Sequence, residues 1–273
     1  MKYDQSASRA SRAPRRGKAQ RSEASPRISS TAHLPRASRT PLRQIIVLGG
    51  GGFSMESRNP RLDLYILAQS HKPNPRICFL PTASGDSRDY IRRFHLAMEK
   101  HDCIPTTLTL FRRDARDPGD IIANQDILYV GGGNTANLLA IWRLHGVDRA
   151  IRRAWQNGVI LTGVSAGMIC WFQSSVTDSF GPLRELNDGL GLLRGSACPH
   201  YDGEKNRRPT FHRLIKSRKL PPGVAADDGA AIHFVGSTIH RCVASRPNAK
   251  AYRVELRNGK VVEEALTTDY LPR

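Results

Sequence analysis

The sequence lacks the features that mark several large classes of protein. None of its apolar runs is long enough to span a membrane, because the longest are strand-sized and broken by Gly, Pro or charged residues. No apolar segment near the N-terminus resembles a signal peptide. The five cysteines are scattered, and no two have the Cys-x-x-Cys spacing of a zinc or redox site. These absences predict a soluble, cytoplasmic protein with reduced, mostly buried thiols and no membrane partner.

Acidic residues are scarce in the first 43 positions. This segment holds two lysines and nine arginines against only Asp4 and Glu23. Its net charge of +9 is half of the chain's net charge of +18. It is rich in Ser, Ala and Pro and poor in large apolar residues, so it cannot bury enough surface to offset the entropy of ordering. We expect residues 1–43 to be a disordered basic arm. A tail for nucleic acid or a membrane surface, an organellar transit peptide and an early start codon all stay open as explanations.

The pattern changes at Gln44, where short apolar runs begin to alternate with amphipathic helical segments. Alternation of this kind predicts a mainly parallel sheet with helices on both faces and functional loops at the carboxyl ends of the strands. After residue 229 the pattern favours antiparallel strands, with Asn258-Gly259 as a type I′ hairpin turn. We therefore treat 44–273 as one α/β domain. The strands are expected at 44–50, 76–82, 106–111, 126–133 and 158–164, and the helices at 60–70, 87–101, 134–146, 147–158 and 166–172.

The most informative stretch is TGVSAGM at 162–168, which puts Ser165 between two glycines where a strand meets a helix. This is the layout of a nucleophile elbow, in which the serine sits on a sharp turn and the helix N-terminus offers N–H groups to an oxyanion. The alternative is a tight strand-to-helix turn with an incidental serine.

A serine nucleophile needs a base, and the chain offers nine histidines. Among them His200 follows an apolar, strand-like segment and Pro199, which places it where a loop would enter a site. A partly buried histidine under a loop is the alternative for His200.

Two glycine runs end predicted strands. Gly131 to Gly133 form a backbone nest that suits an oxyanion. A phosphate loop is the weaker reading of this run, because the Walker lysine and the G-x-G-x-x-G spacing are missing. The run Gly49 to Gly52 lacks the same spacing, and we assign it to close packing or to the substrate rim.

Taken in order, YVGGGNT, GVSAGM, PHYDG and AADDGAA resemble the motifs of the peptidase E family of serine peptidases, which includes aspartyl dipeptidase and cyanophycinase. The resemblance covers residues 44–256. It implies a flavodoxin-like, doubly wound sheet akin to class I glutamine amidotransferases, and hydrolysis through an acyl-enzyme with no metal or organic cofactor.

Site residues follow from the resemblance position by position. Ser165 matches the family nucleophile and His200 the general base, while Gly133 and Ala166 match the two oxyanion-hole amides. The third triad member falls on Asp228, which departs from the usual glutamate by one methylene. Asp227 is the alternative for that role, and Asp178 matches a second aspartate implicated in the family, or is a turn or cap residue.

Substrate preference is where the chain departs from the family. The arginine that holds an acidic substrate side chain belongs between the nucleophile and the second aspartate, but this interval reads WFQSSVT. We therefore expect a peptidase of short peptides without aspartyl specificity. The other arginines considered, each expected to be a solvated surface charge, are Arg184, Arg207 and Arg208.

Two rival functions stay open. An α/β-hydrolase esterase would use Asp202 or Asp228 with His233 or His240, because its chain order is Ser, acid, His. A non-catalytic, amidotransferase-like protein would bind nucleic acid through the arm, although we expect none on the folded domain. A homo-oligomer is compatible with either.

Overall fold

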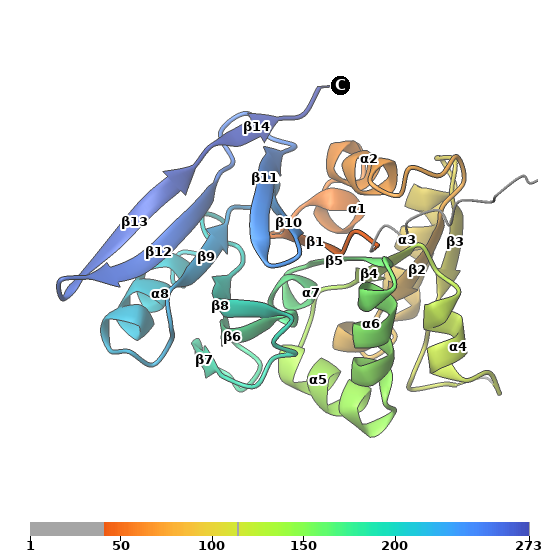
Figure 1. The fold of residues 1–273 in the computed structure, drawn as a ribbon, viewed down its shortest axis with the longest axis horizontal. Helices are drawn as coiled ribbons and strands as arrows, with labels where there is room; N and C mark the ends of the chain where they lie inside the picture. Colours follow the sequence, from red (N-terminus) through yellow and green to blue (C-terminus); the bar gives the residue numbers. More distant parts are fainter. Residues whose placement is uncertain (1–40, 114, 273) are drawn as a thin grey trace, which may run out of the picture. The chain divides into compact units, whose positions relative to one another are not determined.

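The computed structural model describes residues 41–113 and 115–272, so the expected arm lies almost entirely outside the described residues. Within them the chain folds as a mixed α/β protein, drawn in Figure 1. The strands are β1 (Gln44–Leu48), β2 (Arg76–Leu80), β3 (Ile104–Thr107), β4 (Ile127–Val130), β5 (Ile160–Val164), β6 (Phe172–Thr177), β7 (Arg184–Leu186), β8 (Leu193–Cys198), β9 (Gly223–Ala226), β10 (Ala230–Val235), β11 (Thr238–Ala244), β12 (Ala251–Arg257), β13 (Lys260–Leu266) and β14 (Thr268–Tyr270). The helices are α1 (Gly52–Met55), α2 (Arg61–Ala68), α3 (Arg88–Met98), α4 (Pro118–Ala123), α5 (Thr135–Leu144), α6 (Val147–Gln156), α7 (Ala166–Ile169) and α8 (Arg207–Lys216), with a 3₁₀ turn at Thr82–Ser84.

The main sheet has the strand order β14-β11-β10-β1-β5-β4-β2-β3. Five neighbouring strands of this sheet, β1, β5, β4, β2 and β3, run parallel to one another. On the other side of β1, β10 pairs with it in antiparallel register. β5 therefore lies between β1 and β4, so the segments that follow these three strands meet at one edge of the sheet.

Alternate residues of the central strands face opposite sides of the sheet, as the period of two requires. On one side Ile46 and Phe79 pack in a cluster with residues of α1, α2 and α3. On the other side Val47 and Leu128 pack with residues of α4, α5 and α6. The predicted parallel sheet with helices on both faces is confirmed. In the described part of the chain no helix is both long and apolar enough to cross a membrane.

A second sheet, of order β13-β12-β9-β8-β6-β7, was not predicted as a unit. It lies beside the main sheet, with α8 packed against it (Figure 1). The expected antiparallel C-terminal strands are present but divide between the two sheets: β10 and β11 join the first, and β12 and β13 the second. The turn between β12 and β13 has positive φ at both Asn258 (49°) and Gly259 (76°), as a type I′ turn requires.

Several predicted elements end earlier than expected: the strand expected at 126–133 ends at Val130, the helix expected at 87–101 ends at Met98, and two further ends have a clear local cause. The third strand ends at Thr107, not at residue 111, because the Asp86 carboxylate accepts hydrogen bonds from the N–H groups of Leu110 and Phe111 and holds them off the sheet. The helix expected over 166–172 ends at Ile169, since the chain enters β6 at Phe172.

Candidate active site

Ser165 follows β5 directly and is the N-cap of α7. Its φ of 57° and ψ of −112° are strained for a residue with a side chain, which is the mark of a nucleophile elbow. The turn needs glycine on both sides. A Cβ atom at Gly163 would lie 2.5 Å from the carbonyl oxygen of Gly167, and one at Gly167 would lie 2.2 Å from that of Val130. The spacing G-x-S-x-G is thus a steric requirement of this turn.

His200 and Asp228 form a hydrogen-bonded pair. The imidazole Nδ1 lies 2.6 Å from Oδ1 of Asp228, and both side chains are almost buried. The backbone N–H of Asp228 donates to the carboxylate of Asp202 at 2.8 Å, which fixes the turn that carries the acid. This arrangement gives the histidine ring one defined orientation.

Asp227 points elsewhere. Its Oδ2 accepts a hydrogen bond from the N–H of Lys250 at 3.0 Å and one from the hydroxyl of Tyr252 at 3.3 Å. Burial raises the pKa of Asp227 to about 6. Of the two adjacent aspartates, the structure brings only Asp228 to His200.

The first glycine run, Gly49 to Gly52, together with Leu48, is hydrogen-bonded to the segments that carry Ser165, His200 and Asp228. Consecutive carbonyl oxygens of Leu48 and Gly49 accept hydrogen bonds from the N–H groups of Ser165 and His200, each at 3.2 Å. The next residue, Gly50, forms an isolated β-bridge with Asp228, and its carbonyl accepts a hydrogen bond from Gly229 at 3.0 Å. Three successive residues at the end of β1 thus hold the candidate nucleophile, base and acid.

The second glycine run, Gly131 to Gly133, lies against the serine. A Cβ atom at Gly132 would lie 3.2 Å from Cβ of Ser165 and 3.7 Å from its Oγ. Gly133, at a φ of 135°, immediately precedes the N-cap of α5, and Ala166 is the first residue of α7, where an N–H has no acceptor within its own helix. Of the two residues expected to supply oxyanion-hole amides, Ala166 therefore directly follows Ser165, and Gly133 directly follows Gly132, which lies against Ser165.

Sequence reasoning missed two residues at the second run. The N–H of Gly132 donates to the hydroxyl of Tyr90 at 3.2 Å, and this hydroxyl lies 2.7 Å from Oγ of Ser54. Tyr90 is buried, and burial raises the pKa of its phenol. A tyrosine on an amphipathic helix reads as core packing, so nothing in the sequence signalled this contact.

Asp178 does not join the His200 pair. Its Oδ2 lies 3.2 Å from Nη2 of Arg207, and its carbonyl accepts a turn hydrogen bond from Gly181. Its neighbour Ser179 accepts hydrogen bonds from two N–H groups in the first turn of α5. The 177–179 segment thus supports the helix that follows Gly133.

The expectation that Arg207 is a solvated surface charge is wrong. Its side chain is only 4% exposed, and it pairs with Glu204 and Asp178 and donates to the carbonyl of Val176. Arg208 pairs with Glu263, and Arg184 lies over the ring of Phe180.

The histidines of the esterase alternative lie away from the serine. His233 is buried at the middle of β10, opposite Ile46, between the Tyr65 hydroxyl and the Gln44 amide. Burial lowers the pKa of His233 to about 4. His240 is exposed on β11 and contacts His233. The structure therefore does not support the esterase arrangement.

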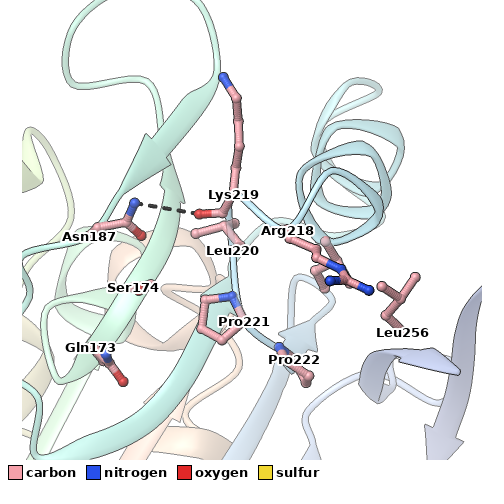
Figure 2. A pocket seen from close by; sticks show the side chains of 10 residues that line it. Gln173, Ser174, Asn187, Arg218, Lys219, Leu220, Pro221, Pro222 and Leu256 are labelled. Atoms are coloured by element: carbon pink, nitrogen blue, oxygen red, sulfur yellow. Dashed lines mark hydrogen bonds between the residues drawn. The ribbon is translucent and has the colours of Figure 1, made fainter. Parts of the chain in front are cut away.

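A cavity of about 500 Å³ lies on the second sheet, away from the candidate triad. In Figure 2, Asn187 donates a long hydrogen bond to the Lys219 carbonyl and Arg218 extends toward Leu256. None of the candidate catalytic residues lines it. No cluster of His, Cys, Asp and Glu suited to a metal ion occurs among the described residues.

Known proteins resemble this chain over about half to most of its length. An uncharacterized peptidase, YgaJ of Bacillus subtilis (strain 168), is 54% identical over 230 residues, which cover 84% of this chain and all of the relative. A peptidase E of Shewanella denitrificans is 31% identical over 134 residues, covering 46% of this chain and 57% of that protein. The crystal structure of a peptidase from an acI-B1 actinobacterium matches with a TM-score of 0.65 at 16% identity, covering 84% of this chain and 96% of that one, which shows a shared fold.

The family model described as peptidase family S51 matches residues 45–242. This range contains the elbow serine, both glycine runs and the His200–Asp228 pair. The resemblance inferred from the four motifs is confirmed: the chain belongs to peptidase family S51, and it is a peptidase.

Proposed function

We propose that this peptidase hydrolyses short peptides through an acyl-enzyme formed on Ser165, with His200 as general base and Asp228 as its orienting acid. The observation that carries the proposal is the 2.6 Å contact between His200 Nδ1 and Asp228 Oδ1, on segments held at the same end of β1 as Ser165.

In the first half of the reaction, Oγ of Ser165 attacks the peptide carbonyl and its proton passes to Nε2 of His200. The carbonyl oxygen becomes an oxyanion, which the N–H groups of Gly133 and Ala166 stabilise. When the C–N bond breaks, His200 returns the proton to the leaving amine. Asp228 holds the Nδ1 proton throughout and balances the charge of the imidazolium.

In the second half a water molecule replaces the amine. His200 takes a proton from the water, whose oxygen attacks the acyl carbon, and the ester bond to Ser165 breaks as His200 returns the proton to Oγ. All steps use the same groups, so no cofactor is needed.

Substrate preference is proposed to be broad at the first residue. Two of the three arginines considered as holders of an acidic side chain already have carboxylate partners: Arg207 has Glu204 and Asp178, and Arg208 has Glu263. The third, Arg184, is exposed on β7, the edge strand of the second sheet, where it lies over the ring of Phe180. A buried acidic side chain without a partner would cost several kcal/mol. We expect Asp-Leu to exceed Ala-Leu in kcat/KM by less than about a hundredfold, equivalent to roughly 2.7 kcal/mol.

The proposal is tested with a panel of dipeptides and short peptides. Ser165→Ala should lower kcat by about 10⁶, as in other triads that lose their nucleophile. Ser217→Ala, at the exposed end of α8, is the matched control and should keep full activity. Equal hydrolysis by Ser165→Ala and wild type would end the serine mechanism, and a preference for Asp-Leu above a hundredfold would end the broad specificity.

A further inference from the structure

A groove of about 330 Å³ runs between α1 and α3 on the flank of the main sheet. Its walls are mainly apolar, and the side chains of Met55 and Leu96 are half exposed at its edge. The lining residues are Phe53, Ser54, Met55, Ser57, Arg93, Leu96, Ala97 and Lys100.

Two of its residues connect this groove to the candidate active site. Ser54 contacts the Tyr90 hydroxyl at 2.7 Å, and that hydroxyl accepts the N–H of Gly132, which lies against Ser165. Met55 lies on the other side: a Cβ atom at Gly50 would be 2.9 Å from its Sδ and 2.0 Å from Oδ1 of Asp228. Two lining residues of the groove therefore contact the groups that lie beside the glycine nest and the candidate acid.

The charge of the lining is of one sign. It contains Arg93 and Lys100 but no carboxylate. Arg93 is fixed on the wall, because its Nη1 donates to the carbonyl of Ser54 at 3.2 Å and its guanidinium lies over the Tyr90 ring at 4.9 Å. Its Nε faces Asp89 at 3.3 Å, but that carboxylate is 65% exposed and shared with Arg92, so solvent weakens the pair.

An apolar groove with a fixed guanidinium suits a ligand with a carboxylate and an apolar side chain. On the proposed function, on which this inference rests, the leaving part of a short peptide has that chemistry. We propose that the groove binds the C-terminal residue of the substrate, with Arg93 pairing with its α-carboxylate and Met55 and Leu96 packing on its side chain. The volume is at the lower end for ligand sites, which favours one residue over a longer chain.

Lys100 has a lesser role in this arrangement. It follows the end of α3 at Met98 and, unlike Arg93, makes no hydrogen bond to the groove wall among the described residues. We assign it a contribution to the positive potential of the groove and assign the pairing with the carboxylate to Arg93.

The test compares one X-Leu dipeptide that the wild type cleaves with the same dipeptide as its C-terminal amide. The wild type should prefer the free acid by about tenfold or more in kcat/KM, mainly through KM, as expected for a charge-assisted pair. Arg93→Gln should lose that preference by raising KM for the free acid while hydrolysing the amide as before. Arg93→Lys should recover part of the preference.

Arg92→Gln is the matched control, since Arg92 pairs with the same Asp89 but does not line the groove. It should keep the wild-type preference. The inference is overturned if the wild type cleaves acid and amide equally well, or if Arg93→Gln slows both to the same extent, which would mean that Arg93 acts only by supporting Tyr90. Ser165-dependent cleavage without a carboxylate preference rejects the groove alone, whereas cleavage that survives Ser165→Ala rejects the proposed serine mechanism.

Discussion

The two glycine runs stand on either side of Ser165, the candidate nucleophile, and contribute opposite groups. The first run, after β1, presents carbonyl oxygens: with Leu48 it accepts the N–H groups of the segments that carry Ser165, His200 and Asp228. The second run, after β4, presents N–H groups: Gly132 lies against Ser165 and donates its N–H to the Tyr90 hydroxyl, and Gly133 directly precedes the N-cap of α5. Because β5 lies between β1 and β4, the strand order places the two runs on opposite sides of Ser165. We call the side of Leu48 to Gly50, which holds the three segments together, the gathering side, and the side of Gly131 to Gly133 the oxyanion side.

Because of this difference, substitutions in the two runs should affect catalysis in different ways. Changes on the first run should disturb the base and acid, because they move the backbone that holds those segments. Changes on the second run should leave the His200–Asp228 pair intact and weaken only the stabilisation of the oxyanion. Four predictions test this separation, from the largest expected effect to the smallest.

The largest effect is expected on the gathering side, at Asp228, and its neighbour Asp227 provides the comparison. Asp228→Asn should lower kcat by about 10² to 10⁴, because an amide can stabilise the wrong imidazole tautomer and cannot balance the imidazolium. Asp227→Asn should do much less, since Asp227 contacts Lys250 and Tyr252 instead. Steady-state kinetics on one dipeptide measure both, and the reverse ranking would move the acid role to Asp227.

The next effect is expected at Gly50. A methyl group there would lie 2.0 Å from Oδ1 of Asp228, so Gly50→Ala must push the acid away from His200. A displacement of about 1 Å in a catalytic group costs about 10² in rate, and we expect a loss of that order in kcat. Gly181→Ala is the comparison, because a methyl group at Gly181 would meet no atom within 4 Å, although its φ of 109° is positive and that of Gly50 is not. Unchanged kcat in Gly50→Ala would contradict the gathering role.

A smaller effect is expected on the oxyanion side. Tyr90→Phe removes the acceptor of the Gly132 N–H but keeps the aromatic packing with Phe53 and Phe79. A whole oxyanion-hole donor is worth about 10² to 10³, so loosening the nest should cost about tenfold in kcat with KM unchanged. A boronic acid analogue of the oxyanion should bind more weakly to the variant by the same factor. If KM rises and kcat stays constant, Tyr90 does not act on the transition state.

The smallest effect on catalysis is expected at Asp63, whose carboxyl group lies next to Gly52 of the first run. Burial raises the pKa of this acid to about 7, and a Cβ atom at Gly52 would touch both its Oδ1 and the Tyr129 hydroxyl. Because the folded pKa lies above the unfolded value, the folded state favours the neutral acid. The contribution of Asp63 to the free energy of unfolding should be fully present below about pH 4 and be lost as the pH rises through about 7.

Asp63→Asn should flatten that pH dependence with little change in kcat/KM at pH 8. Urea unfolding at pH 4.5, 6 and 7.5 measures it, with the exposed Asp89→Asn as control. If wild type and Asp63→Asn show the same change of stability over this range, Asp63 does not contribute in this way.

Much of the oxyanion side was predictable from sequence, because its chemistry is local. The G-x-S-x-G spacing and the Gly131–Gly133 nest each lie within a few residues of the strand that positions them. The pairing of His200 with one of two aspartates also had a sequence signal, in the order of the motifs, but the choice between Asp227 and Asp228 depends on which way adjacent side chains of a turn point.

The gathering side was not predictable in the same way. The contacts of Gly49 and Gly50 join segments about 150 and 180 residues apart in the chain, and no local pattern encodes them. The burial of Arg207 was missed for a related reason: Glu204 is only three residues away, but Asp178 and the Val176 carbonyl lie about 30 residues earlier in the chain and reach Arg207 because α8 packs against β6. Long-range pairing decided both features, where local propensity has little influence.

The most direct test of the account is covalent labelling of Ser165. A phosphonate ester that reacts with activated serines should label the wild type at Ser165, as peptide mass spectrometry would locate it, and should label His200→Ala far more slowly. Ser165→Ala should take up no label, whereas Ser217→Ala should react like the wild type. A label on another serine, or equal rates in wild type and His200→Ala, would contradict the claim that the end of β1 assembles a working triad around Ser165.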